Sequence, residues 1–334
     1  MELLERDRPL ASLAAAHAAA AEGHGSVVLI TGEPGIGKTA LVTAFVSQLG
    51  ERERVLVGAC DDLSVPRPLG PFHDLAGPAT PSLYDSLRSS APPHDVHRSL
   101  LEDLASPPST LLVIEDVHWA DEATLDAITV IGRRVAQLPV ALLLTYREGE
   151  VGAGHPLHAA VGSLHVEPSR HLRLAPLSPA AVAALAGADA DRVHAMTGGN
   201  PFYVTEVLAT GSAGIPGTVR DIVLARVLQL SRRAAAVVEA ASIAPPSLDA
   251  SLLLAVCGEA ADSVDECLAS GVLQAVDGAV AFRHELARAT VEEALSPARR
   301  LALHRAVFMA LADAGRGSLD LARISYHAEA AGDR

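Results

Sequence analysis

Eight consecutive residues, Gly32-Glu33-Pro34-Gly35-Ile36-Gly37-Lys38-Thr39, decide the fold of this 334-residue chain. They match the pattern GxxxxGK followed by Ser or Thr, and they stand between the apolar, β-branched run Ser26–Thr31 and the helical pattern Ala40–Leu49. A strand, a glycine-rich loop and a helix in this order let backbone N–H groups and a helix N-terminus surround a phosphate. The sequence therefore predicts a P-loop.

The last two residues of the expected P-loop have separate tasks. Lys38 would reach the β- and γ-phosphates of a nucleotide, and the Thr39 hydroxyl would bind Mg²⁺. Because Lys38 is the one lysine among 26 basic residues, a chance lysine at this place in the pattern is rare. The residues that we expect to bind the nucleotide here are Gly32, Glu33, Pro34, Gly35, Ile36, Gly37, Lys38, Thr39 and Ala40.

A second motif supplies the acids that a P-loop site requires. Leu111–Ile114 predicts a buried strand, and Glu115 and Asp116 follow it directly. Since ligands of open α/β sheets bind at the carboxyl ends of the strands, we expect these acids beside the P-loop. Glu115 would hold Mg²⁺ through water, and Asp116 would polarise the attacking water. Many strands end in acidic residues without such a role. The interpretation of Glu115 and Asp116 therefore depends on the P-loop motif that precedes them.

A third motif ends another expected strand. Val140–Thr145 is followed by Tyr146 and Arg147, a polar pair placed to sense the γ-phosphate. Arg147 would neutralise the charge that develops in phosphoryl transfer. The alternative is a solvated surface arginine.

The first 175 residues alternate strand and helix patterns, which predicts an α/β P-loop NTPase domain with a parallel sheet and helices on both faces. Residues 64–95 are rich in proline and predict loops and short helices. The remaining elements expected here are helices over residues 8–22 and 123–135, a strand over 55–59, and an edge strand over 171–174.

The pattern changes near Pro176 and predicts a smaller, mostly helical part. Residues 176–214 would form a helical lid and residues 215–285 a winged-helix-like domain, with 286–334 starting a further helical region. Asp277-Gly278 predicts a hairpin turn between two short strands. The expected helices are 178–186, 191–196, 201–209, 218–230, 232–243, 286–295, 297–312 and 319–331, with a linker over 211–217.

The composition excludes several function classes. Hydrophobic residues make up 49% of the chain, so packed cores are expected and wholesale disorder is excluded. The net charge of −14 argues against DNA or anionic membranes as partners. Cys60, Cys257 and Cys267 have no metal-ligand spacing and indicate a reducing compartment. The acidic start, MELLERDRPL, and the short apolar runs predict a cytoplasmic protein without a membrane span.

Taken together, the motifs resemble those of the signal-transduction ATPases with numerous domains (STAND), an AAA-type class. The similarity rests on TGEPGIGKTAL, LLVIEDVHWADEATLD, LLLTYRE, GGNPFYVTEVL and FRHELARATVEEAL, and it extends to the opening ERDRPLASL. Within this class the chain is most similar to the ATPase module of the large ATP-binding transcriptional regulators of the LuxR family. The resemblance covers nearly the whole chain.

The resemblance implies roles for further residues. Arg147 matches the first sensor arginine, and Pro201 matches a proline that packs on the adenine. His284 matches a histidine that touches the β-phosphate of bound ADP and locks the winged-helix domain, although a packing role is the alternative. Arg6 matches loosely a residue near the adenine. Trp119 and Asp121 belong to the HWAD signature and receive no role, and Asn200 is expected to cap a helix.

The function implied is a slow ATPase switch with an ADP-locked resting state and an ATP-bound active state that self-associates. An unidentified protein or small molecule would be its inducer. The alternative is a scaffold module that binds nucleotide with little hydrolysis, which Glu115 favours, because the general pattern has Asp there. A small-molecule phosphotransferase is disfavoured, because the lid lacks basic residues around 178–187. Sensor repeats and a DNA-binding helix-turn-helix, present in larger members, are not expected within these residues.

Overall fold

The computed structural model describes residues 3–50, 53–63, 67–152, 154–211, 215–313 and 321–332. The chain divides into two compact units, Met1–Ala175 and Pro176–Arg334, which are described separately. Among the described residues, no helix combines the length and the apolar character that crossing a membrane requires.

The first unit is built on a parallel sheet whose strands lie in the order β2-β3-β4-β1-β5. The central strand β4 pairs with β1 on one side and β3 on the other, with Tyr146 beside Thr31 and Leu144 beside Ile114. The carboxyl ends of β1, β4 and β3 therefore form one continuous edge. The strands are β1 (Ser26–Thr31), β2 (Arg54–Ala59), β3 (Thr110–Glu115), β4 (Val140–Tyr146) and β5 (His171–Arg173).

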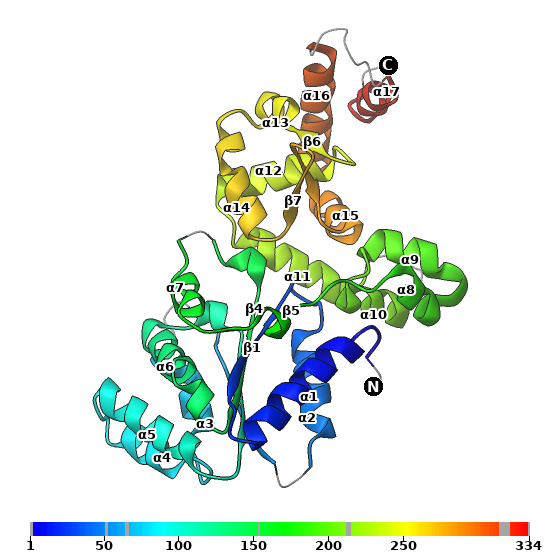
Figure 1. Cartoon of the computed structure of the whole chain (residues 1–334). Helices are drawn as coiled ribbons and strands as arrows, with labels where there is room; N and C mark the ends of the chain where they lie inside the picture. Colours follow the sequence, from blue (N-terminus) through cyan, green and yellow to red (C-terminus); the bar gives the residue numbers. More distant parts are fainter. Residues whose placement is uncertain are drawn as a thin grey trace. The chain divides into compact units, whose positions relative to one another are not determined.

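Helices cover both faces of this sheet, as the sequence predicts (Figure 1). Because side chains alternate along a strand, Val28 and Ile30 pack toward α1 (Asp7–Ala21) and α2 (Lys38–Gln48). Val27 and Leu29 belong to the second core, toward the helices on the opposite face. Those helices are α3 (Gly70–Leu75), α4 (Pro81–Arg88), α5 (Pro93–Ala105), α6 (Glu122–Gly132) and α7 (Leu157–Gly162).

The short helices α3 and α4 agree with the expected character of residues 64–95, of which 64–66 lie outside the described residues. Helix α5 is not among the predicted elements. Its buried side chains, Val96, Leu100 and Leu104, recur every four residues and face the core. Short 3₁₀ turns follow β3 and β4: η1 (Val117–Trp119) and η3 (Glu148–Glu150).

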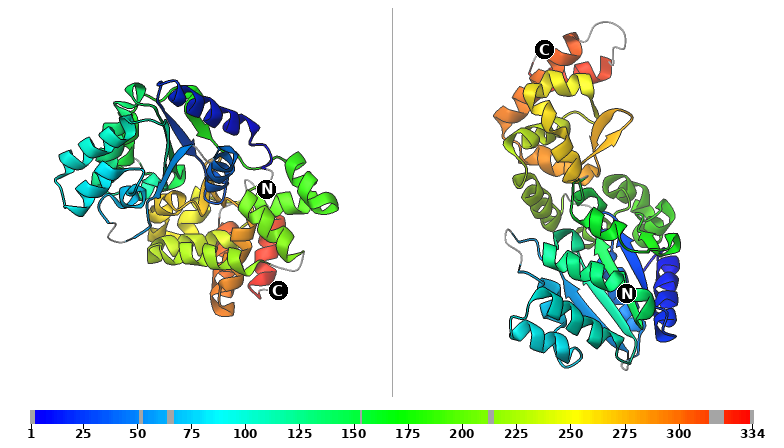
Figure 2. Two further views of the ribbon diagram at one scale, coloured as in Figure 1. Left: turned by 90° about the horizontal axis from the view of Figure 1, so that it is seen from below. Right: turned by 60° about the vertical axis from the view of Figure 1, so that its left-hand side comes forward.

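The second unit is mostly helical and contains a small antiparallel sheet of order β6-β8-β7 (Figure 2). Strands β7 (Leu273–Val276) and β8 (Ala279–Phe282) form the predicted hairpin, and Asp277 and Gly278 have the positive φ of its turn. Strand β6 (Leu248–Asp249) pairs with β8 and was not predicted. The expected linker falls partly on residues 212–214, outside the described residues.

The helices of the second unit follow the predicted boundaries closely, except for α13 and α14, which were not predicted. Residues 319 and 320 of the last expected helix lie outside the described residues. The helices are α8 (Pro179–Ala186), α9 (Ala190–Thr197), α10 (Pro201–Thr210), α11 (Gly217–Leu228), α12 (Arg232–Ser242), α13 (Ala250–Cys257), α14 (Val264–Ala269), α15 (Glu285–Ala294), α16 (Pro297–Asp313) and α17 (Leu321–Ala330).

Candidate functional site

The glycine-rich loop curls between β1 and α2. Gly32, Gly35 and Gly37 have φ values of 145°, 75° and 96°, which glycine adopts without steric cost. Gly37 is the N-cap of α2, so the helix begins at Lys38. A Cβ on Gly32 would lie 3.1 Å from the Leu174 carbonyl oxygen. The shape of the loop therefore depends on these glycines. The loop leads directly into the N-terminus of α2, where backbone N–H groups can bind an anion.

The Lys38 side chain folds back along the loop. Its ammonium group donates hydrogen bonds of 3.0 Å to the carbonyl oxygens of Gly32 and Glu33. Only 7% of the residue is exposed. Burial, with a smaller contribution from the positive charge of Arg147, lowers the pKa of Lys38 to about 8. An anionic phosphate placed beside this ammonium would stabilise its charged form, so the site favours an anion.

Thr39 and Glu115 bring two oxygen donors together. The Thr39 hydroxyl donates a hydrogen bond of 2.5 Å to Glu115 Oε2 at the end of β3. Mg²⁺ prefers hard oxygen ligands and keeps several waters, so one hydroxyl and one carboxylate suit it. Among the described residues, no group of three or more His, Cys, Asp or Glu side chains is gathered for a metal. The pair therefore fits a magnesium ion whose remaining ligands come from phosphates and water.

Asp116 directly follows Glu115 and turns the chain sharply. Its φ of 53° lies in the left-handed region, which is uncommon for residues other than glycine and which aspartate adopts more readily than most. Its backbone N–H donates to the Thr145 hydroxyl at 2.9 Å, which ties the end of β3 to β4. Backbone strain of this kind concentrates at functional sites.

Arg147 lies at the same edge, one residue beyond the pairing of Tyr146 with Thr31. Its NH1 group contacts Glu150 Oε1 at 2.8 Å, and its Nε lies 3.9 Å from Asp116 Oδ1. The guanidinium carbon lies 4.6 Å from the centre of the Trp119 ring, within cation–π range. The side chain is 22% exposed and is held by these contacts, while its role toward a phosphate stays a prediction.

Two residues that the sequence analysis did not select, Glu150 and His118, belong to this cluster. His118 Nε2 lies 3.1 Å from Glu150 Oε2, and the His118 side chain is 1% exposed. Burial alone would raise the pKa of Glu150, but hydrogen bonds from His118 and Arg147 lower it to about 2. No sequence signal marks Glu150, because it lies between Gly149 and Val151, beyond the motif LLLTYRE.

Asp121 of the HWAD signature has a structural task. Its carboxylate caps α6 by accepting from the backbone N–H groups of Ala123 and Thr124. It also accepts a hydrogen bond from the Leu69 N–H at 3.2 Å, which joins the start of α3 to the start of α6. Asp121 therefore fixes the segment that carries His118 and Trp119.

Arg6 binds the backbone of the P-loop. One guanidinium nitrogen donates to the carbonyl oxygens of Ile36 at 3.2 Å and Ala175 at 2.9 Å. The residue is 6% exposed, and burial lowers the pKa of its guanidinium. The structure thus places Arg6 on the backbone of the loop, while a contact with adenine stays a prediction.

Pro201 and His284 belong to the second unit. Asn200 caps α10 by accepting from the Phe202 N–H at 3.1 Å, as predicted, and Pro201 is the first residue of that helix. The His284 ring meets the Tyr203 ring edge-on at 4.8 Å. A Cβ on Gly198, whose φ is 59°, would lie 3.1 Å from His284 Nδ1. The GGNP segment and His284 therefore lie together, and their roles toward a nucleotide stay predictions.

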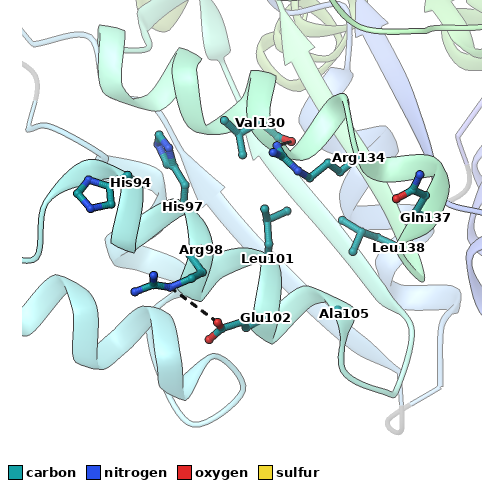
Figure 3. Close-up of a pocket in the computed structure, with 10 residues that line it drawn as sticks. All are labelled: His94, His97, Arg98, Leu101, Glu102, Ala105, Val130, Arg134, Gln137 and Leu138. Carbon is teal, nitrogen blue, oxygen red and sulfur yellow. Dashed lines mark hydrogen bonds and ion pairs between the residues drawn. The ribbon is translucent and has the colours of Figure 1, made fainter.

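An open groove elsewhere in the first unit is separate from this site. Figure 3 shows its lining from α5, α6 and the segment that leads into β4, including His97, Arg134 and Leu138. Because Leu138 precedes β4 and α5 leads into β3, the groove lies toward the amino ends of the strands. The P-loop follows the carboxyl end of β1, so the two sites lie at opposite ends of the sheet.

Comparison with known proteins finds a similarity within the first unit. Residues 2–144, less than half of the chain, match the model of the AAA ATPase domain, so this part of the chain is similar to AAA-type P-loop ATPase domains. A curated relative, an uncharacterized protein of Rhizobium meliloti (strain 1021), is 26% identical across 99% of this chain. The alignment covers 39% of that relative, so the chain spans well under half of its length.

One of the solved structures compared supports the fold. A Walker-type ATPase of Pyrococcus abyssi aligns with a TM-score of 0.62 at 14% identity, covering 86% of this chain and 96% of that one. A STAND protein with a tetratricopeptide repeat sensor from Pyrococcus horikoshii aligns at 13% identity, over 99% of this chain and 48% of that one. Its TM-score of 0.42 is too low to show a common fold.

Proposed function

We propose that the chain is a nucleotide-operated switch that binds ATP with Mg²⁺, hydrolyses it slowly and rests with ADP bound. The observation that carries this proposal is the meeting of three strand ends at one edge of the sheet. Lys38 follows β1, Arg147 follows β4, and Glu115 ends β3, where it contacts Thr39. Two cations for phosphates and an oxygen pair for a metal are the groups that phosphoryl transfer requires.

Each residue then has a defined task. Lys38 holds the β- and γ-phosphates, and Arg147 balances the negative charge that grows on the γ-phosphoryl group. Asp116 accepts a proton from the attacking water, since its carboxylate belongs to the same cluster as Arg147. A bound Mg²⁺ would be held by the oxygens of Thr39 and Glu115 and would supply positive charge to the phosphates. Arg6 keeps the loop in shape through the Ile36 carbonyl.

The second unit would sense which nucleotide is present. In this proposal residues 176–214 act as a lid, with Pro201 on the adenine, and residues 215–285 act as a winged-helix-like domain. His284 would touch the β-phosphate of ADP and stabilise the resting state. The packing of His284 against Gly198 and Tyr203 supports this assignment, because any movement of the lid then displaces the histidine. A switch requires such differential contacts with its two nucleotides.

The biological setting is part of the proposal. The motif resemblance supports a cytoplasmic transcriptional regulator of the LuxR type, in which ATP promotes self-association and an inducer shifts the balance between the two states. The chain spans 39% of the length of its curated relative, so the activity and partners of a whole regulator are part of the proposal. The net charge of −14 agrees with DNA contact lying elsewhere.

A second candidate is a scaffold module that binds nucleotide and hardly hydrolyses it. The contact of Glu115 with Thr39 favours it, because the two metal-binding oxygens are already hydrogen-bonded at 2.5 Å. A metal ion must break this hydrogen bond to enter. The same contact between Thr39 and Glu115 is therefore compatible with slow ATP hydrolysis and with none.

Turnover of ATP without any added acceptor tests the proposal. The wild-type chain should release phosphate slowly, and Lys38→Ala and Asp116→Asn should both abolish the release. ADP should stay bound to Asp116→Asn, because that substitution leaves the P-loop intact. Nucleotide binding without measurable release in the wild type would favour the scaffold. Phosphate transfer only on addition of a small-molecule acceptor would contradict both.

A further inference from the structure

A cradle of three side chains holds Arg147 in place. Glu150 lies three residues further along the chain on η3, and His118 and Trp119 lie on η1 after β3. We propose that Glu150, seated by His118, is a positioning residue that fixes the Arg147 guanidinium on Trp119 for recognition of a γ-phosphate. This inference rests on the proposed function and extends it to residues for which the motifs give no role.

The contacts around Glu150 use both of its carboxylate oxygens. Oε1 lies 2.8 Å from Arg147 NH1, and Oε2 lies 3.1 Å from His118 Nε2. The side chains of Arg147 and Glu150 are 22% and 23% exposed, so water screens their attraction only partly. Glu150 therefore connects a cation at the edge of the site with a histidine in the interior.

The other side of the cradle is aromatic. The Trp119 ring faces the Arg147 guanidinium at 4.6 Å, and the His118 ring packs on the Trp119 ring at 4.5 Å. The His118 carbonyl oxygen lies 3.1 Å from His155 Nε2, which ties η1 to the segment before α7. Asp121 caps α6 immediately after this turn. Each member of the cradle is thus held by a further contact.

These contacts limit the freedom of the arginine. A free arginine side chain has about 2 kcal/mol of rotamer entropy, which binding of a phosphate would otherwise have to overcome. The ion pair and the ring stack remove part of this cost before a ligand arrives. Groups that are preorganised toward developing charge stabilise it most strongly, so the cradle suits a sensor of the γ-phosphate.

The position of the cradle separates ATP from ADP. Arg147 follows the strand that lies between the P-loop strand and the Glu115 strand, and its charge reaches Lys38. A γ-phosphate would lie beside this edge, whereas the α- and β-phosphates are held by the loop itself. Loss of Glu150 should consequently weaken ATP binding and leave ADP binding almost unchanged.

Equilibrium binding of MgATP and MgADP to the full chain tests the inference. The variants are Arg147→Ala, Glu150→Gln and the combination of both. Glutamine keeps the shape and an acceptor oxygen but loses the charge. We expect Glu150→Gln to weaken MgATP binding about tenfold and MgADP binding less than about twofold. Because Glu150 acts through Arg147, the double variant should bind MgATP no more weakly than Arg147→Ala alone.

Glu148→Gln is the matched control, since it removes a charge from the same turn. Glu148 accepts from Thr31 at 2.7 Å and pairs with Arg173, without a contact to Arg147. Its ratio of MgATP to MgADP affinity should equal that of the wild type. Trp119→Leu removes the aromatic ring on which Arg147 packs and should likewise weaken MgATP binding more than MgADP binding. This variant tests the inference independently if Glu150→Gln folds poorly.

The possible failures are distinguishable. If Arg147→Ala changes the ratio of affinities but Glu150→Gln and Trp119→Leu do not, the inference is wrong and the proposed function stands. If the two single substitutions give additive losses, or weaken MgADP equally, Glu150 has a structural role and the inference is overturned. If the wild type binds neither nucleotide, both the proposed function and the inference are wrong.

Discussion

The Thr39 hydroxyl donates a hydrogen bond of 2.5 Å to the Glu115 carboxylate, which joins the first turn of α2 to the end of β3. The residues are 76 positions apart in the chain, yet they supply the oxygen pair of the candidate metal site. A glutamate reaches the hydroxyl directly, whereas an aspartate would be one methylene shorter. The side-chain length at position 115 therefore controls how easily a metal ion enters.

Shortening this side chain should increase turnover. In Glu115→Asp the direct contact with Thr39 is lost and the space can take a metal ion, so we expect ATP hydrolysis to rise severalfold. Glu115→Gln keeps the length of the side chain but removes its charge. It should weaken the affinity for Mg²⁺ about tenfold or more. Phosphate release measured across a Mg²⁺ titration checks both. Equal activity of Glu115→Asp and the wild type would show that length is not limiting.

Lys38 should make the nucleotide-free protein less stable at neutral pH. Its pKa is about 8 in the folded chain and 10.5 in a model peptide, so folding disfavours the protonated form. The full cost, about 3 kcal/mol at most, applies below pH 8, and it disappears as the pH rises from 8 toward 10.5. Lys38→Met should raise the melting temperature at pH 7 and lose most of this advantage by pH 10.

Thermal unfolding of both proteins without nucleotide, at pH 7 and pH 10, checks this prediction. Saturating ADP should reverse the order at pH 7, because only the wild type gains binding energy. A difference between the two proteins that is the same at both pH values would contradict the account of Lys38.

Loss of the Arg6 brace should loosen the P-loop. In Arg6→Ala the carbonyl oxygens of Ile36 and Ala175 lose their shared donor. Because the guanidinium is buried, we expect about 1–3 kcal/mol of destabilisation and weaker binding of ADP and ATP alike. Denaturant unfolding and nucleotide titration check this. Arg8→Ala, which changes an exposed arginine two residues away, is the control and should leave both properties unchanged.

Gly198→Ala should disturb His284. The added Cβ would lie 3.1 Å from Nδ1 of the histidine, and the φ of 59° adds about 1–2 kcal/mol of strain. Gly271→Ala is the control, because Gly271 also has a positive φ, 72°, with nothing within 4 Å of the added atom. The destabilisation of Gly198→Ala in excess of the control measures the His284 contact. If His284 senses ADP, ADP dissociation should accelerate only in Gly198→Ala.

The motif-bearing part of the fold is readable from sequence. Ser26–Thr31 is apolar throughout and is buried throughout, so periodicity and burial agree. The glycines and Lys38 follow it without a break, and Glu115 and Asp116 end a strand of the same kind. Parallel topology then requires these ends to share an edge, which is why distant motifs could be joined into one site.

The remaining parts depend on contacts that no local pattern encodes. Glu150 lies in the polar stretch Glu148–Glu150, and its partner His118 is 32 positions earlier. Only the adjacent ends of β3 and β4 bring them together. Helix α5 begins at Pro93, after a second proline that indicates a loop, while its apolar spacing at Val96, Leu100 and Leu104 was the stronger signal. Strand β6 is two residues long and has no detectable period.

The most direct test of the central claim is the nucleotide that the protein binds. The full chain and Lys38→Ala would be purified and denatured, the released nucleotide identified by chromatography, and the emptied proteins titrated with MgATP and MgADP. The account predicts bound adenine nucleotide, chiefly ADP, on the wild type and none on Lys38→Ala, with binding of both nucleotides restored only to the emptied wild type. A wild-type chain that carries no nucleotide and binds neither MgATP nor MgADP would contradict it.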